Sequence, residues 1–257
     1  MIDSNYEVYL ANTAESKRIH FKIRYQVYCE DKHFESVSRF PDGQEKDEYD
    51  ENDAVHFIVK HIPSQKWVAA MRLVRNERCE LPIEGKCAIQ ADVDVKSQRA
   101  LEISRMCIVK EHRGIRGRSV NVDNEDYNVH QVNTNVVAFK GRDHRVFRFN
   151  SGQQIMLALI RSVYQYGQSN QIPFGFALMT KAFARVLSFT GLNIRVSGES
   201  CEYNGTRFPF LFDLVNVVKD IARMPSGLQR FFVHGLEYKL FSQHGNDMYL
   251  LPSAKYK

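Results

Sequence analysis

Three closely spaced runs of strand-forming residues constrain the fold more than any other feature of the sequence. AVHFIVKHI at 54–62 and WVAAMRLVRN at 67–76 are β-rich and are separated by a short turn that contains a proline. LEISRMCIV at 101–109 has the alternation of a third strand. We therefore expect an antiparallel hairpin and a further strand at the centre of a sheet.

The alternation in the third run predicts which side chains share a face of the sheet. Successive side chains of a strand point to opposite faces. One face is therefore expected to carry Glu102, Ser104, Met106 and Ile108, and the other Leu101, Ile103, Arg105 and Cys107.

A strand and a helix are predicted before the hairpin. YEVYL at 6–10 has the pattern of a short edge strand, and Asn12 and Thr13 are candidates for the cap of a helix that reaches about Cys29. In this helix Arg24 and Tyr28 are four residues apart on one face, so both can point into the same site.

A second set of elements follows the third strand. We expect a helix at 152–168, a strand at 172–179 and a helix at 180–191 that begins after a threonine cap and ends on glycine. Two more strands surround a turn at Asn204 and Gly205. This order predicts an α/β sandwich around one mixed sheet.

The sequence has no second domain boundary, so residues 1–257 are expected to form one domain. Residues 119–150 have no stable period and are interpreted as an insertion. The tail at about 214–257 is expected to be helical, with breaks at Pro225 and Gly227.

The acidic segment from 31 to 53 is too polar for a core element and is predicted to be a long loop. Loops of this length in compact domains often cover a binding site. It is therefore a candidate for a lid over a substrate.

Composition limits the other classes of protein. The chain has no apolar run of about 18 residues and no secretory signal pattern, which favours a cytoplasmic protein that does not span a membrane. Nine histidines and five cysteines lack metal-binding spacings, so we predict no metal. The scattered cysteines are interpreted as reduced thiols: Cys29, Cys79, Cys87, Cys107 and Cys201.

The net charge of +5, from 35 basic and 30 acidic residues, is too small to indicate a nucleic-acid partner. The segment KEHRGIRGR at 110–118 has four Lys or Arg residues and one acid. It suits phosphate groups or an acidic protein, although a solvated loop would have the same composition.

Four fragments, in order, resemble the acyl-homoserine-lactone (autoinducer) synthase family: IRYQVYCEDKHF, EKDEYDEND, AAMRLV and EISRMCIV. They cover about the first 110 residues. The resemblance implies a GNAT-like (acyl-CoA N-acyltransferase) fold. It also implies an active-site cleft made by Arg24, Tyr28, Asp47, Asp50, Arg72, Glu102 and Arg105.

The chain departs from that family at two positions. Autoinducer synthases usually have Trp where this chain has Phe34 and Leu101. The insertion, the tail and these positions are more similar to acyltransferases associated with bacterial PEP-CTERM/exosortase systems, and to long-chain N-acyl amino acid synthases. The resemblance thus implies transfer of an acyl group from an acyl carrier protein or acyl-CoA thioester to the amine of an amino-acid-like acceptor.

This chemistry needs a base, an oxyanion site and a route for the leaving thiol. Glu102 is the candidate base, and backbone N–H groups from Met106 to Ile108 are the candidate oxyanion donors. Cys107 could be a nucleophile, or it could be apolar packing. The candidate catalytic residues are Glu102, Arg105, Met106 and Cys107.

The other cleft residues are candidates for acceptor binding, since guanidinium groups bind carboxylates at two points and aspartates bind ammonium groups. A structural ion-pair network that braces the acidic loop is the alternative. The candidate substrate-binding residues are Arg24, Tyr28, Phe34, Asp47, Asp50 and Arg72.

The donor is expected to approach the basic segment, where HRGIRGRS is out of register with a coenzyme A pyrophosphate loop. Arg113, Arg116 and Arg118 would then face an acidic carrier protein. Aromatic and sulfur side chains could line an acyl tunnel, or they could be plain core: Phe174, Phe176, Met179, Phe183 and Phe189.

Two other functions stay open. The chain could be an autoinducer synthase, which acylates S-adenosylmethionine and closes a lactone. It could also be a non-catalytic module that binds an acyl carrier or a lipid. No cofactor is expected beyond the acyl-ACP or acyl-CoA donor.

Overall fold

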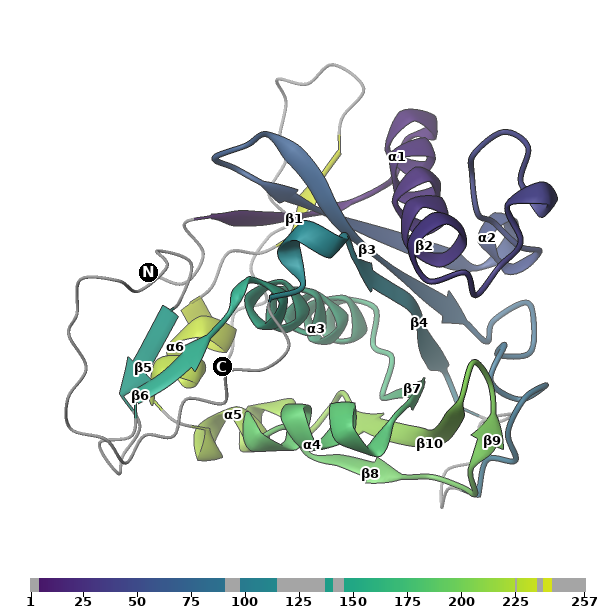
Figure 1. Ribbon diagram of the computed structural model, residues 1–257. Coiled ribbons are helices and arrows are strands. Elements are labelled where there is room, and N and C mark those ends of the chain that lie inside the picture. The colour runs from purple at the N-terminus through teal and green to yellow at the C-terminus, as the bar shows by residue number, and fades with distance from the viewer. Residues whose placement is uncertain are drawn as a thin grey trace.

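The expected mixed sheet is present in the computed structural model, which describes residues 5–90, 98–114, 137–140, 146–224, 226–234 and 238–241. Within these residues the order is β11-β1-β2-β3-β4-β7-β10-β8, with β9 paired to β10 (Figure 1). The strands of this sheet are β1 (Tyr6–Leu10), β2 (Ala54–His61), β3 (Lys66–Arg75), β4 (Ala100–Ile108), β7 (Phe174–Met179), β8 (Ile194–Val196), β9 (Cys201–Glu202), β10 (Thr206–Asp213) and β11 (Lys239–Leu240).

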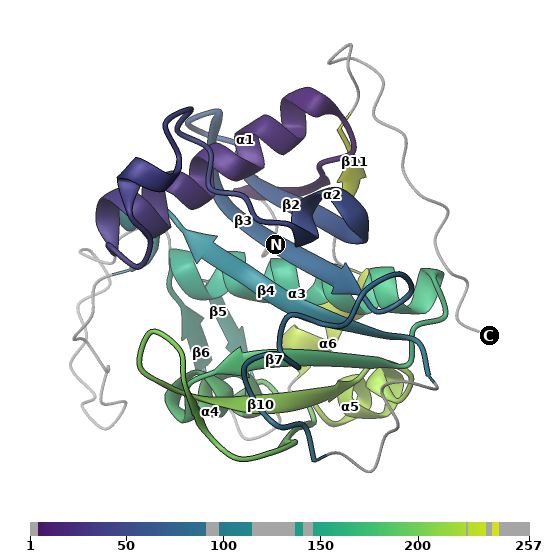
Figure 2. The same cartoon turned by 90° about the vertical axis from the view of Figure 1, so that its right-hand side faces the viewer.

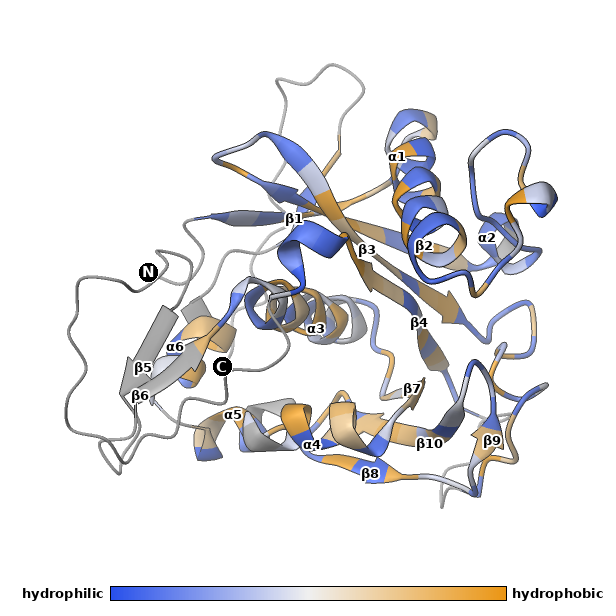
Figure 3. Cartoon of the chain, viewed as in Figure 1, coloured by the Kyte–Doolittle hydropathy of each residue, from blue (hydrophilic) through white to orange (hydrophobic). Residues whose placement is uncertain are grey.

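Helices cover both faces of the sheet, which confirms the predicted α/β sandwich. Figure 1 shows α1 (Ala14–Tyr25) and α2 (Tyr49–Asn52) on one face of β2 to β4, and α3 (Ser151–Ser169) on the other. Apolar residues gather on the strands and on α3, where these layers meet (Figure 3). The remaining helices are η2 (Gln26–Asp31), η3 (Val37–Arg39), η4 (Lys110–His112), α4 (Lys181–Phe189), α5 (Val217–Arg223) and α6 (Ser226–His234).

Local capping explains where the main helices begin. Thr13 and Ser16 form a capping box at α1, and Asn150 and Gln153 form another at α3. Thr180 caps α4 as the sequence predicts. After α1 the chain continues as the π-helix η2, which keeps the helical path through the site segment.

The sheet consists of two halves that are joined for only a short distance. Strands β1 to β4 are antiparallel neighbours, and β4 then pairs with β7 in parallel. The parallel register covers only Ala100 to Glu102 on β4. Figure 2 shows the two strands separating beyond this point.

Strand β4 contains a bulge, and the predicted alternation is therefore wrong beyond Ser104. Arg72 lies opposite Ser104, whereas Ala70 lies opposite Cys107, so two residues of β4 oppose one residue of β3. Arg105 has a φ of 51°. The bulge turns Arg105 toward Asp47, which Arg72 also contacts, whereas strict alternation puts Arg105 on the face opposite Ser104.

Several sequence interpretations of the ends of the sheet are corrected by the structure. β1 is not an edge strand, because β11 pairs with it in parallel. The predicted helical tail thus includes a strand, and Gly227 lies inside α6 and does not break it. In the predicted insertion, β5 (Val137–Lys140) and β6 (Val146–Phe149) form an antiparallel pair. None of the described helices has the length and apolar character needed to cross a bilayer.

The interpretation of all five cysteines as reduced thiols is wrong for two of them. Cys87 and Cys201 form a disulfide across 114 residues of sequence. It joins the loop after β3 to strand β9. Sequence spacing could not indicate this bond, because the two segments meet only through the order of the strands.

This disulfide should contribute strongly to stability. Closing a loop of this length restricts the unfolded chain, and we expect the double variant Cys87→Ala/Cys201→Ala to lose about 4 kcal/mol in the free energy of unfolding. Urea denaturation of oxidised protein measures this loss. Reductant should destabilise the wild type similarly and leave the double variant unchanged. Cys79→Ala, which removes a free thiol, is the control. Equal midpoints with and without reductant would contradict the prediction.

Candidate active site

A cavity of about 790 Å³ opens where β4 and β7 separate. Its polar lining comes from β3, β4, the loop after β3 and the β9–β10 turn, and includes Arg72, Lys86, Glu102 and Tyr203. Its apolar lining comes mainly from α3 and α4: Met156, Ile160, Phe183, Val186 and Leu187. One cavity therefore has polar and apolar walls on either side of β4.

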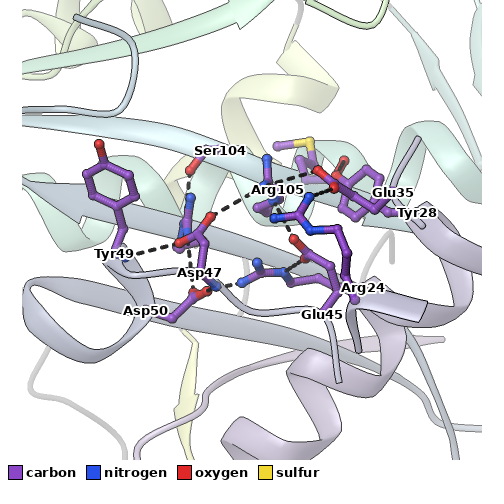
Figure 4. A network of polar contacts seen from close by, with 12 residues as sticks. Arg24, Tyr28, Glu35, Glu45, Asp47, Tyr49, Asp50, Ser104 and Arg105 are labelled. Atoms are coloured by element: carbon purple, nitrogen blue, oxygen red, sulfur yellow. Dashed lines mark hydrogen bonds and ion pairs between the residues drawn. The ribbon is translucent and has the colours of Figure 1, made fainter. Parts of the chain in front are cut away.

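A network of charged side chains lies beside the polar wall (Figure 4). Arg24, at the end of α1, is fully buried and bonds to Glu45 and, at 2.7 Å, to Asp50. Arg72 on β3 contacts Asp47 at 2.5 Å and Asp50 at 3.1 Å. The network thus ties α1 and the sheet to the acidic loop between them.

Asp50 is the centre of this network. Its carboxylate accepts hydrogen bonds from Arg24, from the Asp47 amide at 2.8 Å, and from His56 Nε2 at 3.1 Å. Burial by itself would raise the pKa of Asp50, but the His56 hydrogen bond and the charges of Arg24 and Arg72 hold it well below its usual value. Asp50 is therefore ionised and fully engaged with protein groups.

Arg105 connects the network to the cavity. Its guanidinium bonds to Glu45 at 3.2 Å, to Asp47 at 3.3 Å, and to the hydroxyl of Tyr203 at 2.9 Å. Its left-handed backbone conformation is costly for a bulky residue. The many contacts of the side chain help to hold that conformation.

Two aromatic residues form another part of the lining. Tyr28 on η2 donates a hydrogen bond to the Met106 carbonyl at 3.2 Å, and its ring stacks on Phe34. Burial raises the pKa of Tyr28 well above its usual value, so its hydroxyl stays protonated. Phe34 is 42% exposed, which leaves one side of this pair open to solvent.

Glu102 is the carboxylate best placed for proton transfer. It lies at the last register pair between β4 and β7, lines the cavity and is only 5% exposed. Burial raises the pKa of Glu102 to about 7, against the opposing effects of the Ile83 amide, which donates to it at 2.5 Å, and the charges of Arg72, Lys86 and Arg105. Glu102 can therefore gain or lose a proton near neutral pH.

Cys107 also lines the cavity, but its thiol is poorly suited to nucleophilic attack. Burial raises the pKa of Cys107 to about 12, so the thiolate is scarce at neutral pH. This observation favours the packing alternative for Cys107.

The predicted donor residues are only partly described. Arg113 lines the cavity, pairs with Asp31 and donates to the Ile108 carbonyl at 2.6 Å. Arg116 and Arg118 lie outside the described residues.

The structure brings most predicted site residues together. One group lines the cavity, and a second group lies in the charged network beside it. Lining the cavity are Tyr28, Phe34, Arg72, Glu102, Arg105, Met106, Cys107 and Arg113. Arg24, Asp47 and Asp50 are not among the lining residues and lie in the adjacent network. Of the aromatic tunnel candidates, Phe174 and Phe176 pack in a separate apolar cluster, so the tunnel prediction is wrong for them. Met179 and Phe183 do line the cavity, and nothing is described of the Phe189 side chain.

Sequence reasoning missed several charged and polar residues of this region, among them Lys32, Glu35, Glu45, Lys86 and Tyr203. Glu45 begins the fragment EKDEYDEND and was accessible to the same argument as its neighbours. Lys86 and Tyr203 lie in segments with no motif, and only the fold brings them to the cavity. Within the described ranges no group of three or more His, Cys, Asp or Glu residues could hold a metal ion.

Removing the central charge of the network should destabilise the protein. Asp50→Asn keeps the shape of the side chain but leaves Arg24 and Arg72 buried without its charge, and we expect a loss of about 3 kcal/mol or more in the free energy of unfolding. Chemical denaturation at neutral pH measures this. Asp42→Asn, which removes an exposed partner of Lys46, is the matched control and should cost less than about 1 kcal/mol. Similar costs for the two variants would show that the network does not stabilise the fold.

Comparison with known proteins agrees with this architecture. Residues 23–122 match the family described as an acetyltransferase (GNAT) domain.

The structure is similar to that of BjaI, a CoA-dependent acyl-homoserine lactone synthase solved with SAM and isopentyl-CoA. The sequence identity is 17% over 86% of this chain and 90% of that chain, and the TM-score is 0.53. It is also similar to the AHL synthase LasI, with 14% identity, coverage of 82% and 91%, and a TM-score of 0.51. FeeM, an N-acyl amino acid synthase from uncultured soil microbes, has 9% identity, coverage of 85% and 94%, and a TM-score of 0.52. The chain therefore has the GNAT fold, with a mixed sheet flanked by helices.

Proposed function

We propose that this chain is an N-acyltransferase that moves an acyl group from a thioester to the amine of an amino-acid-like acceptor. The observation that carries the proposal is the position of Glu102. This buried carboxylate has a pKa near 7 and lies in a cavity with a polar and an apolar wall. Such a cavity suits an amine acceptor and an acyl chain that meet at β4.

The reaction needs one proton to leave the amine and one to reach the thiol. The amine nitrogen attacks the thioester carbonyl carbon and forms the C–N bond, while its proton passes to Glu102 directly or through water. Collapse of the tetrahedral intermediate breaks the C–S bond. The departing sulfur then takes the proton from Glu102, which restores the carboxylate. Where solvent protonates the sulfur instead, Glu102 releases its proton to solvent.

The oxyanion of that intermediate requires donors near the base. The stretch from Met106 to Ile108 follows the point where β4 and β7 separate, and it lines the same cavity as Glu102. We assign the oxyanion site to backbone N–H groups of this stretch. Direct attack by the amine needs no acyl-enzyme, in keeping with the high pKa of the Cys107 thiol.

The acyl chain is assigned to the apolar wall. Met156 and Ile160 on α3 face the cavity together with Phe183, Val186 and Leu187 on α4. Burial of methylene groups there would contribute about 0.8 kcal/mol each. The size of the side chains on these two helices would then limit acyl length.

The donor is assigned to the side of Arg113, with an acyl carrier protein as the expected partner. Arg113 lies where the cavity meets the segment that precedes α3, and the basic residues predicted there suit an acidic carrier. An acyl-CoA donor is the alternative, since BjaI is a CoA-dependent synthase. The association with an exosortase system stays a prediction.

A lactone-forming synthase is the second candidate function, favoured by the similarity to BjaI and LasI. Incubation of the protein with acyl-carrier and acyl-CoA thioesters, pooled amino acids and S-adenosylmethionine distinguishes the two by mass spectrometry. N-acyl amino acids support our proposal. Acyl-homoserine lactone would replace it with the alternative, and absence of turnover with every pair would favour a non-catalytic binding module.

Loss of the base should reduce turnover. Glu102→Gln keeps the shape of the side chain but cannot accept the proton, and we expect kcat to fall about 100-fold or more. Steady-state release of free thiol measures this. Glu77→Gln, which removes a carboxylate paired with Arg99 outside the cavity, should retain wild-type kcat. Full activity of Glu102→Gln would disprove the assignment of the base.

The rate should depend on pH through the same group. Because the pKa of Glu102 is raised to about 7, the carboxylate is mostly protonated below this pH and becomes an available base above it. The kcat/KM of the wild type should therefore rise through pH 7. The acceptor amine also titrates, near about 8, so Glu102→Gln is the control and should keep only the amine inflection. A wild-type profile with the same inflections as this variant would contradict the prediction.

A further inference from the structure

One wall of the cavity is built from two segments that are far apart in sequence. The loop at 81–90 contributes Lys86, and the β9–β10 turn contributes Tyr203 and Asn204. Neither segment belongs to the fragments that resemble a known family. The chemistry of this wall therefore has to be worked out from its contacts.

The loop at 81–90 is fixed at several points. The Cys87 amide donates to the Ile83 carbonyl at 2.9 Å, and the Cys87 side chain is joined to Cys201 by the disulfide. The Gln90 amide donates to the Ser197 carbonyl at 2.6 Å. Gly198 packs so closely that an added Cβ would lie 2.1 Å from the Ala88 carbonyl. The backbone next to Lys86 therefore has a defined position relative to the β9–β10 turn.

The side chain of Lys86 has a defined neighbour as well. Its ammonium lies over the Tyr203 ring, 4.5 Å from the ring centroid. Tyr203 in turn accepts a hydrogen bond from Arg105 through its hydroxyl. Lys86 is thus placed at the same side of the cavity as the charged network, although it makes no contact with the acids of that network.

Lys86 differs from most arginines that line the cavity in having no anionic partner among the described residues, a property that it shares with Lys32, the other lysine of the lining. Arg72, Arg105 and Arg113 each pair with a carboxylate. Arg207 uses its guanidinium on the carbonyls of its own turn. Among the described residues no carboxylate pairs with Lys86, and its charge is close enough to Glu102 to lower the pKa of that carboxyl. Of the two lysines of the lining that have no carboxylate partner in the described part of the chain, Lys86 is therefore the one placed to act together with Glu102.

We propose that Lys86 binds the carboxylate of an α-amino acid acceptor and so directs its amine to Glu102. This inference rests on the proposed acyltransferase function and names the acceptor-binding residue of that site. An α-amino acid has its carboxylate and amine on one carbon, so a carboxylate at Lys86 places the amine within the reach of a neighbouring group. The charges match, since the incoming ammonium meets Glu102 and the carboxylate meets Lys86. The ammonium first loses one proton through Glu102 to solvent, and the neutral amine then attacks as described above. An amine without a carboxylate would add positive charge beside an unpaired lysine, which disfavours it.

The test compares one amino acid with its carboxamide, which keeps the amine and side chain but has no negative charge. The wild type should prefer the free acid. Lys86→Met should lower kcat/KM for the free acid about ten- to hundredfold, as expected for loss of a charge-assisted contact, and should leave that for the carboxamide unchanged or raise it, because the repulsion of its ammonium is removed. Lys86→Arg should retain most of the preference. Lys60→Met is the matched control, because Lys60 also lies over an aromatic ring, Trp67, but outside the cavity.

The outcomes separate this inference from the proposed function. Equal losses with both acceptors for Lys86→Met would mean that Lys86 only supports the wall, and they would overturn the inference. A wild type that uses only amines without a carboxylate would also overturn it, while acyl transfer would stand. A wild type that acylates no amine would overturn the proposed function, and this inference with it.

Discussion

The buried carboxylate of Asp50 is the interaction on which the rest of the site depends. Asp50 lies between Arg24 on α1 and Arg72 on β3, and a charge so removed from water is tolerated only when its partners are in place. The acidic loop therefore cannot leave the sheet without leaving two buried guanidinium groups unpaired. For this part of the loop, a brace is physically more reasonable than a lid that opens freely. The contacts of Asp50 and Arg24 favour the alternative of a structural network, which the sequence left open, whereas Arg72 and Arg105 also reach the cavity.

Strand β4 connects this ion-pair network to the cavity. Up to Glu102 the strand is paired on both sides, so that carboxylate is buried and its pKa is raised. After Glu102 the pairing with β7 ends, and the bulge at Arg105 directs that guanidinium to Glu45 and Asp47. The proposed base Glu102, an open strand edge and the arginine at 105 thus follow one another within residues 102–105. The ion pairs of Arg105 with Glu45 and Asp47 help to offset the cost of its left-handed backbone.

The parts of this structure that could be predicted from sequence are those set by local patterns. The hairpin of β2 and β3 follows from strand propensity and a short turn, and α4 follows from its threonine cap and terminal glycine. The resemblance to autoinducer synthases pointed to residues that the fold brings together, although only Tyr28, Arg72, Glu102 and Arg105 line the cavity and the other three lie in the network beside it. The faces predicted for the side chains of β4 are wrong beyond Ser104, because an alternating pattern does not reveal the extra residue of the bulge at Arg105. The pairing of Cys87 with Cys201, and the position of β11 beside β1, depend on contacts between segments distant in sequence.

The two sides of the cavity are held by different physical means, and this difference bears on how specificity could change. The apolar side belongs to α3 and α4, whose side chains also form the main core, so changes there alter packing and stability together. The wall that carries Lys86 is held by a disulfide, by backbone hydrogen bonds and by the contact with Tyr203. Its exposed side chains contribute little to the core. Under the proposed function, substitutions in this wall would therefore alter acceptor choice at low cost to folding, whereas the carboxylate of Glu102 and the ion pairs of Asp50 would be needed for any acceptor.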